Sequence, residues 1–139
     1  MTVKDELVQS LMAHVATGTG TVLADNVTES WLSIVRKFSP LIGATSVLLI
    51  FERSLDSNSA AFSWLPVLPF PAQPDTAIER LHASMAALPD DTILAAHRAL
   101  LVTFIDLMTT LIGARLTVQF LRAAFPAVSP GSNTEEKPE

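Results

Sequence analysis

Apolar residues recur along most of this chain at intervals of three and four, the spacing of one face of an α-helix. The first helix is expected over residues 3–17, with apolar positions at Leu7, Val8, Leu11 and Val15. The same spacing runs through residues 31–51, where Pro40 is expected to kink the helix because proline lacks the backbone N–H. It returns over residues 75–88 and 92–124. The pattern therefore predicts an all-α chain with four helical segments.

Glycine and proline separate these segments and set the domain organisation. Residues 17–21 alternate threonine and glycine, and residues 56–74 form a proline-rich connector. Residues 126–139 combine proline and glycine with a Glu-Glu-Lys run, a composition typical of a disordered tail. The prediction is one helical domain over residues 1–125, with a first helical hairpin at about 3–55 and a second at about 75–125.

The two hairpins resemble each other. The tetrapeptide Leu-Ile-Gly-Ala occurs at residues 41–44 and again at 111–114, so the residue numbers of the two copies differ by 70. At the same offset Asp5 aligns with Asp75 and Leu11 with Leu81. The favoured interpretation is a tandem duplication that builds a four-helix bundle from two hairpins, each a short helix followed by a long one. The alternative is convergent composition in helices rich in alanine and leucine.

The repeated glycines, Gly43 and Gly113, lie inside predicted helices, where glycine costs about 1 kcal/mol relative to alanine. We expect them to mark a close helix crossing, and the alternative is that each marks only a bend. A twofold axis across the bundle would make the long helices antiparallel and would place Arg53 beside Asp106 as its ionic partner. The last segment is apolar on more than one face, which predicts a homodimer.

Composition narrows the possible partners. Hydrophobic residues make up 49% of the chain and charged residues only 17%, so part of the surface is expected to lie against a partner. The net charge of −5 argues against nucleic acid, which requires clustered basic residues. The chain has no cysteine, which excludes disulfides and thiolate chemistry.

Location is predicted from the N-terminal residues and the longest apolar run. The N-terminal residues lack the basic region and apolar run of a secretory signal, so a cytoplasmic protein is expected. Residues 99–114 form the longest apolar run, which Asp106 interrupts and which is shorter than the roughly 20 residues that span a bilayer. Association with a membrane surface remains a weaker alternative.

Candidate chemistry is sparse. No two of His14, His82 and His97 are three or four residues apart, so no helical metal motif is present, and neither a metal nor a cofactor is expected. His97 is similar to the histidine of phosphotransfer domains in its helical setting, but the lysine and glycine that follow that histidine are absent here. A structural histidine in a surface or half-buried position is therefore expected. Asp106 is expected to be structural, held by a salt bridge or by a nearby threonine.

These features favour a small, non-enzymatic regulatory or interaction module that acts through helix–helix association, with another protein or a second copy as partner. The alternative is a bundle that binds an apolar ligand or cofactor between the hairpins, with His97 or His82 as a contact. The aromatic residues of the connector, Phe62, Trp64 and Phe70, are expected to fold back over the bundle, and the alternative is a recognition surface.

Overall fold

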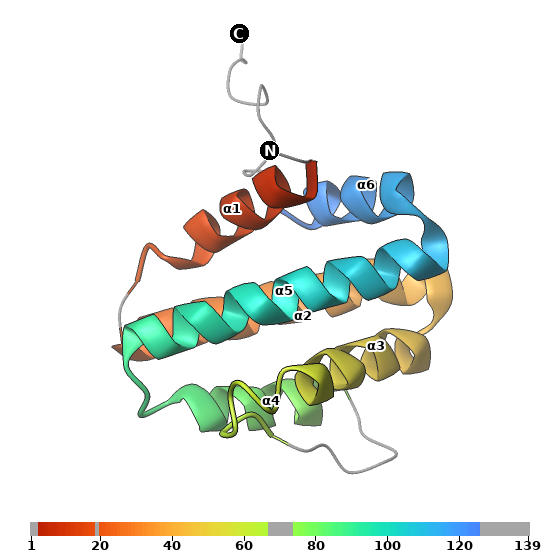
Figure 1. Ribbon diagram of the computed structural model, residues 1–139. Coiled ribbons are helices and arrows are strands. Elements are labelled where there is room, and N and C mark those ends of the chain that lie inside the picture. The colour runs from red at the N-terminus through yellow and green to blue at the C-terminus, as the bar shows by residue number, and fades with distance from the viewer. Residues whose placement is uncertain (1–2, 19, 67–73, 126–139) are drawn as a thin grey trace, which may run out of the picture.

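The computed structural model describes residues 3–18, 20–66 and 74–125, and every regular element in those ranges is an α-helix (Figure 1). The six helices are α1 (Val3–Val15), α2 (Gly20–Ile42), α3 (Ala44–Ser57), α4 (Pro74–Met85), α5 (Asp90–Ile112) and α6 (Ala114–Ala124). The predicted all-α class is confirmed. The tail over residues 126–139 and most of the second half of the connector lie outside the described residues.

Helical spacing predicts the buried face of each helix. In α1 the buried side chains are those of Leu7, Val8, Leu11 and Val15, as the sequence pattern indicated. In α2 the buried face continues from Leu23 to Phe38, and it includes Trp31. These faces meet in one core, so their burial supplies the hydrophobic driving force that individual short helices lack.

The number of helices differs from the four that the spacing predicted, because each long segment is interrupted at its glycine. Gly43 ends α2 and Gly113 ends α5, both with a φ of 92°. Pro40 does not cause the first break, because α2 continues past it to Ile42. The second break occurs at the equivalent place without any proline, since the residue that aligns with Pro40 in the second half is Thr110. Glycine is the feature that the two breaks share.

The expected close helix crossing at these glycines is absent. A Cβ atom added at Gly43 or Gly113 would meet no heavy atom within 4 Å. Both residues combine their φ of 92° with a ψ near 150°, given as 145° and 155°, a region that is essentially limited to glycine. The glycines are therefore required by the backbone at two sharp bends, which we call the elbows, and not by the approach of another helix.

This geometry changes what a substitution at the elbows should do. We expect Gly43→Ala or Gly113→Ala to lower the free energy of unfolding by about 1–3 kcal/mol, because an L-residue is strained at this φ and ψ. Leucine should cost about as much as alanine, since there is open space around each Cβ position. Urea unfolding of the alanine and leucine variants tests this, and a much larger cost for leucine would contradict it by indicating a tight crossing.

The long helices α2 and α5 run side by side in the same direction, and both elbows lie at one end of the bundle (Figure 1). The backbone N–H of Gly20, the first residue of α2, donates to Asp90 Oδ1 at 2.9 Å, so the two helices also begin together. The predicted antiparallel arrangement is therefore wrong. Helix α5 contacts α1, α2, α3 and α6, so several of its apolar faces are covered by its own chain.

The helix boundaries repeat along the chain. Helices α2 and α5 each have 23 residues, and the offset that relates the two tetrapeptides also relates their first and last residues. Their following elbows and the helices after those, α3 and α6, begin at the same offset. The contacts repeat as well, because α3 packs on α5 as α6 packs on α2, and α1 packs on α5 as α4 packs on α2. Each half thus contains three helices.

Candidate functional site

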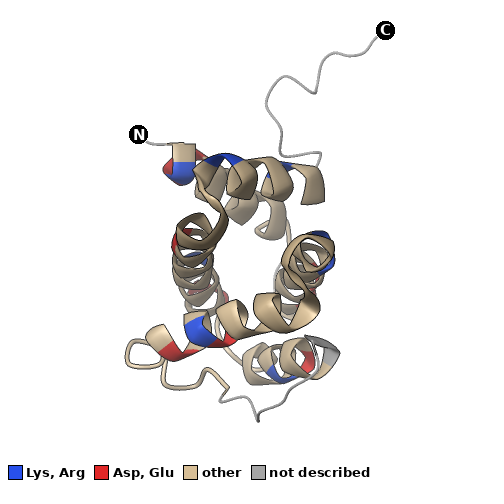
Figure 2. Ribbon diagram, turned by 90° about the vertical axis from the view of Figure 1, so that its right-hand side faces the viewer, with Lys and Arg blue, Asp and Glu red and all other residues tan. Residues whose placement is uncertain are grey.

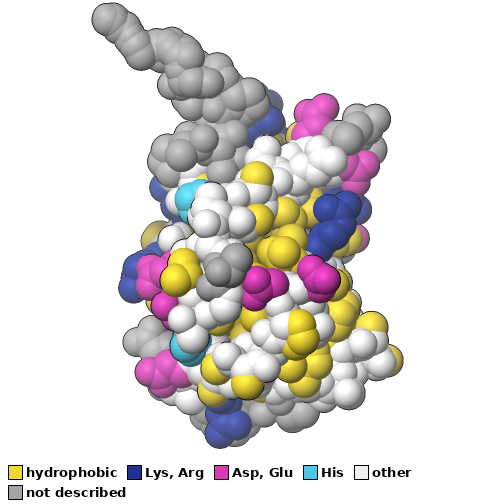
Figure 3. Space-filling model, turned by 90° about the vertical axis from the view of Figure 1, so that its left-hand side faces the viewer, with side chains coloured by type: hydrophobic (Ala, Val, Ile, Leu, Met, Phe, Trp, Pro, Cys, Tyr) yellow, Lys and Arg dark blue, Asp and Glu magenta, His cyan; other side chains and the backbone are white. Residues whose placement is uncertain are grey.

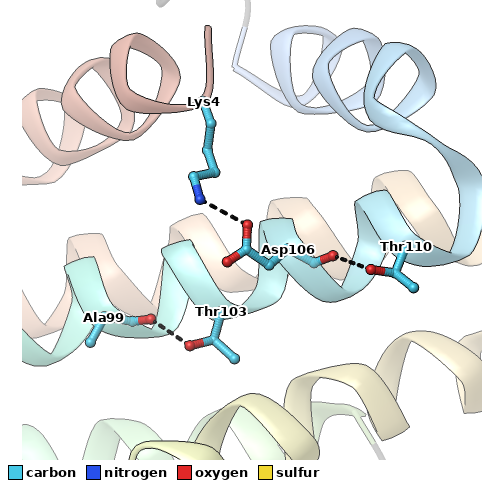
Figure 4. A network of polar contacts seen from close by, with 5 residues as sticks. All are labelled: Lys4, Ala99, Thr103, Asp106 and Thr110. Carbon is cyan, nitrogen blue, oxygen red and sulfur yellow. Dashed lines mark hydrogen bonds and ion pairs between the residues drawn. The ribbon is translucent and has the colours of Figure 1, made fainter. Parts of the chain in front are cut away.

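Asp106 lies on α5, where its carboxylate faces α1 (Figure 4). Lys4 Nζ lies 2.9 Å from Asp106 Oδ1, and the two side chains are 39% and 56% exposed. An exposed pair of this kind contributes about 0–1 kcal/mol. Thr110 donates to the backbone carbonyl of Asp106 and not to its carboxylate. The predicted structural role of Asp106 as a salt-bridge residue agrees with this geometry.

Arg53 is not the ionic partner of Asp106. It lies on α3, where it lines a groove together with Leu107 and Thr110 of α5. Adjacent residues of a helix point about 100° apart, so Asp106 faces α1 while Leu107 faces α3. The prediction failed because it rested on antiparallel long helices, whereas the parallel arrangement brings Lys4 to the carboxylate.

Asp106 and Arg53 each line a groove on the described surface. The first lies between α1, α5 and α6 and has a volume of about 570 Å³. Val3, Ile105 and Val118 supply apolar lining, and the Lys4–Asp106 pair lies at its edge. The second lies between α3 and α5 and has a volume of about 410 Å³, with Leu49 and Leu111 in its lining. We name them the α1–α6 groove and the α3–α5 groove.

His97 lies in the core of the bundle, although a surface or half-buried position was expected. Its side chain is 1% exposed, and neither ring nitrogen has a hydrogen-bond partner among the described residues. Burial lowers the pKa of His97 from 6.5 to about 3, because the protonated ring would lose its hydration. The indole ring of Trp31 lies edge-on to it, with 5.9 Å between ring centroids. The histidine is therefore neutral at physiological pH.

Two further buried polar atoms of α2 have no hydrogen-bond partner among the described residues. These are Trp31 Nε1 and Ser30 Oγ. A buried polar group left without a hydrogen bond costs about 1–3 kcal/mol. At the offset of 70, His97 aligns with Val27 and Trp31 with Leu101. Each of these two residues therefore has an aliphatic counterpart in the other half of the chain. Helical spacing indicated an apolar position for Trp31 but not for His97, and it did not reveal that their ring nitrogens would lack hydrogen bonds.

The other two histidines lie at the surface, away from the core position of His97. His82 Nε2 of α4 lies 2.7 Å from Asp25 Oδ1 of α2, which links the two helices. His14 packs edge-on against Phe125, with ring centroids 5.3 Å apart. Among the described residues, no three histidine, cysteine or acidic side chains cluster as metal ligands would.

Asp90, the first residue of α5, also helps to position α2. Its carboxylate accepts the N–H of Gly20 and so caps the first turn of α2 from the other half of the chain. Negative charge at the start of a helix is also favourable for the helix dipole. Gly20 and Asp90 are equivalent positions at the offset of 70, a relation that could have suggested their proximity.

The described aromatic residues of the connector pack against the bundle. Phe62 and Trp64 are partly buried against the core, and their ring centroids lie 6.3 Å apart. Leu65 beside them is buried. The expectation that this segment folds back is confirmed for Phe62 and Trp64, whereas Phe70 lies outside the described residues.

No family model, no curated protein and no solved structure matches this chain. In the part of the chain that the structure describes, α5 alone is long and apolar enough to cross a membrane, and 44% of its most apolar stretch is buried inside the bundle. Core helices of water-soluble proteins have the same composition, so this property does not distinguish the two cases.

Proposed function

We propose that this protein is a non-enzymatic interaction module that associates with a second copy of itself through the end of the bundle where the two elbows lie. Four large apolar side chains at this end are 39–56% exposed, and we call them the elbow surface: Leu41, Leu49, Leu111 and Leu116. Six large apolar side chains are exposed in the described residues, so most of them belong to this one end.

The chain around the elbows also lacks charge. Residues 38–51 and 107–114 contain no Lys, Arg, Asp or Glu. Figure 2 views this end, and the elbows nearest the viewer carry neither blue nor red. The opposite end, in Figure 3, displays several acidic side chains among apolar ones. Depletion of charge distinguishes the centres of protein interfaces from other surface, so the elbow end has the composition of a contact.

The α3–α5 groove adds shape to this surface. Leu49 and Leu111 line it, and it leads from the middle of α3 towards the second elbow. A groove of this kind can accept an apolar side chain from a partner, which is how interface hot spots form. The observation that carries the proposal is therefore the concentration of exposed leucines around two uncharged elbows, beside a groove in which Arg53 is the one charged lining residue.

A second copy is the proposed partner because the repeat relates two of the four exposed leucines to each other. Leu41 and Leu111 occupy equivalent positions at the offset of 70, each two residues before its elbow glycine. We further propose that the chain arose by tandem duplication of a three-helix unit, with the pseudo-twofold axis running along α2 and α5. Such an axis leaves the elbow end with similar features on both sides, and twofold dimers require a self-complementary surface.

Sedimentation velocity at micromolar concentrations tests the association. We expect the mass to rise with concentration from the 14.9 kDa of one chain towards twice that value. The double substitution Leu41→Lys, Leu111→Lys should hold the mass at one chain, because burying two lysines in an apolar contact is unfavourable. The matched control is Val22→Lys, which changes a residue that is 53% exposed near the start of α2, at the other end.

The control separates this surface from general apolar adhesion. Val22→Lys should associate as the unchanged protein does. If the unchanged protein stays at the mass of one chain at every concentration, or if Val22→Lys dissociates it as completely as the elbow substitutions, the proposal is wrong.

A further inference from the structure

The α1–α6 groove has the size and lining of a site for a small ligand. Its volume of about 570 Å³ lies within the range of about 300–1,000 Å³ that ligand sites usually occupy. Ile105 of α5 is buried beneath it, and Val3 of α1 and Val118 of α6 line it on either side. Val3 remains 54% exposed, so the groove presents apolar surface that no residue of the described chain covers.

Positive charge surrounds this apolar lining. Lys4, Arg115 and Arg122 all line the groove, against one carboxylate, that of Asp106. These are three of the nine basic residues in a chain whose net charge is −5, so the local charge opposes that of the whole protein. Lys4 is paired with Asp106, whereas Arg115 and Arg122 form no ion pair with any described residue. The excess charge of the groove is therefore positive.

The two arginines act from one helix. Arg115 and Arg122 are seven residues apart on α6, which is two helical turns and places them on the same face. Arginine binds carboxylates with two parallel hydrogen bonds and remains charged at any physiological pH. A groove that is apolar along its floor and carries arginines along one wall is complementary to an anion with an apolar chain.

We propose that the α1–α6 groove binds a long-chain carboxylate of the fatty-acid class, with its carboxylate on Arg115 or Arg122 and its chain over Val3, Ile105 and Val118. Removal of the chain from water drives binding, and the arginines select for negative charge. The site lies between α1 of the first half and α5 and α6 of the second. It is separate from the elbow leucines that line the α3–α5 groove, so its occupancy does not depend on self-association through Leu41 and Leu111.

Titration calorimetry with dodecanoate on the full chain tests this site. We expect one dodecanoate per chain, with weaker binding at higher salt because the arginines are exposed. Dodecanol, which has the same chain without the charge, should bind at least about tenfold more weakly, as expected for the loss of one charge-assisted contact. Dodecyltrimethylammonium should bind most weakly of the three.

Two sets of variants assign the binding to the groove. The double substitution Arg115→Gln, Arg122→Gln should weaken dodecanoate binding about tenfold and leave dodecanol binding unchanged. Val118→Trp should weaken both by filling the groove. The matched control is Arg36→Gln, Lys37→Gln, which removes two charges of α2 that line neither groove. This control should bind all three probes as the unchanged protein does.

The proposal is overturned if dodecanoate does not bind, if it binds no more tightly than dodecyltrimethylammonium, or if the arginine variant and the control lose affinity equally. The arginine substitutions lie on exposed positions and should not affect folding, which circular dichroism verifies. The same titration on the Leu41→Lys, Leu111→Lys protein distinguishes the two proposals, because a monomeric chain should still bind dodecanoate.

Discussion

Acidification from about pH 7.5 to about pH 5 should lower the free energy of unfolding by about 2 kcal/mol through His97 alone. The unfolded chain binds a proton at this histidine near its ordinary pKa of 6.5, whereas the folded chain does so only near pH 3. Between these values the unfolded state holds more protons, so stability falls as the pH falls. The loss begins near pH 6.5 and is complete near pH 3, where the folded state also becomes protonated.

Urea unfolding at a series of pH values measures this effect. His97→Leu should remove the contribution of about 2 kcal/mol between the two pH values, because leucine fills a similar volume and does not titrate. At neutral pH the substitution should cost little, since it also removes two ring nitrogens that have no hydrogen bonds in the described structure. The control is His14→Leu, which replaces an exposed histidine and retains His97.

The result bears on whether His97 is buried in solution as the structure places it. The control should keep the acid sensitivity of the unchanged protein. A His97→Leu protein that loses stability with acid as steeply as the unchanged protein would show that the histidine is accessible to protons in the folded state. It would also imply that its nitrogens reach water or another polar group.

Truncation of the central tryptophan should have the largest effect on stability. Trp31 is fully buried, and its ring lies against those of Phe51 at 5.0 Å and Phe104 at 5.3 Å between centroids. We expect Trp31→Ala to lower the free energy of unfolding by about 3–5 kcal/mol, because the substitution leaves a cavity and removes both the burial of the indole ring and its contacts with the neighbouring rings. The chain has one other tryptophan, Trp64, which is only partly buried, so Trp64→Ala should cost distinctly less.

Circular dichroism during urea unfolding measures both variants. If Trp31→Ala does not fold, Trp31→Phe provides the comparison, since it keeps an aromatic ring and removes the indole N–H that has no described partner. Equal costs for Trp31→Ala and Trp64→Ala would contradict a core centred on Trp31. Such a result would place the stabilising contacts in the connector instead of between α2 and α5.

Local pattern was sufficient for the helices and for much of the core. The spacing of Leu7, Val8, Leu11 and Val15 predicts a helical face, and those side chains are the ones that α1 buries. The same spacing covers residues 31–51 and 92–124, which include Trp31 and Phe104, and both side chains are buried. This succeeds because one face of an amphipathic helix has to be removed from water whatever its neighbour is.

The offset of 70 residues between the two halves is also visible in the sequence, and the boundaries of α2 and α5 repeat at this offset. The sequence did not contain the conformation of Gly43 and Gly113, because a glycine inside an apolar run is compatible with a crossing, a bend or a break. The positive φ that ends each helix is a backbone property that only the folded chain reveals. The equivalent positions Pro40 and Thr110 show why proline was a misleading guide to the break.

Tertiary structure decided how the helices face one another, and therefore which residues meet. Asp106 pairs with Lys4 and not with Arg53 because α2 and α5 run parallel, a relation between distant segments that apolar spacing does not encode. His97 became a buried, neutral histidine for the same reason, since its surroundings come from residues of other helices. Periodicity records which face of a helix avoids water, whereas the identity of the opposing side chain depends on packing among all the helices at once.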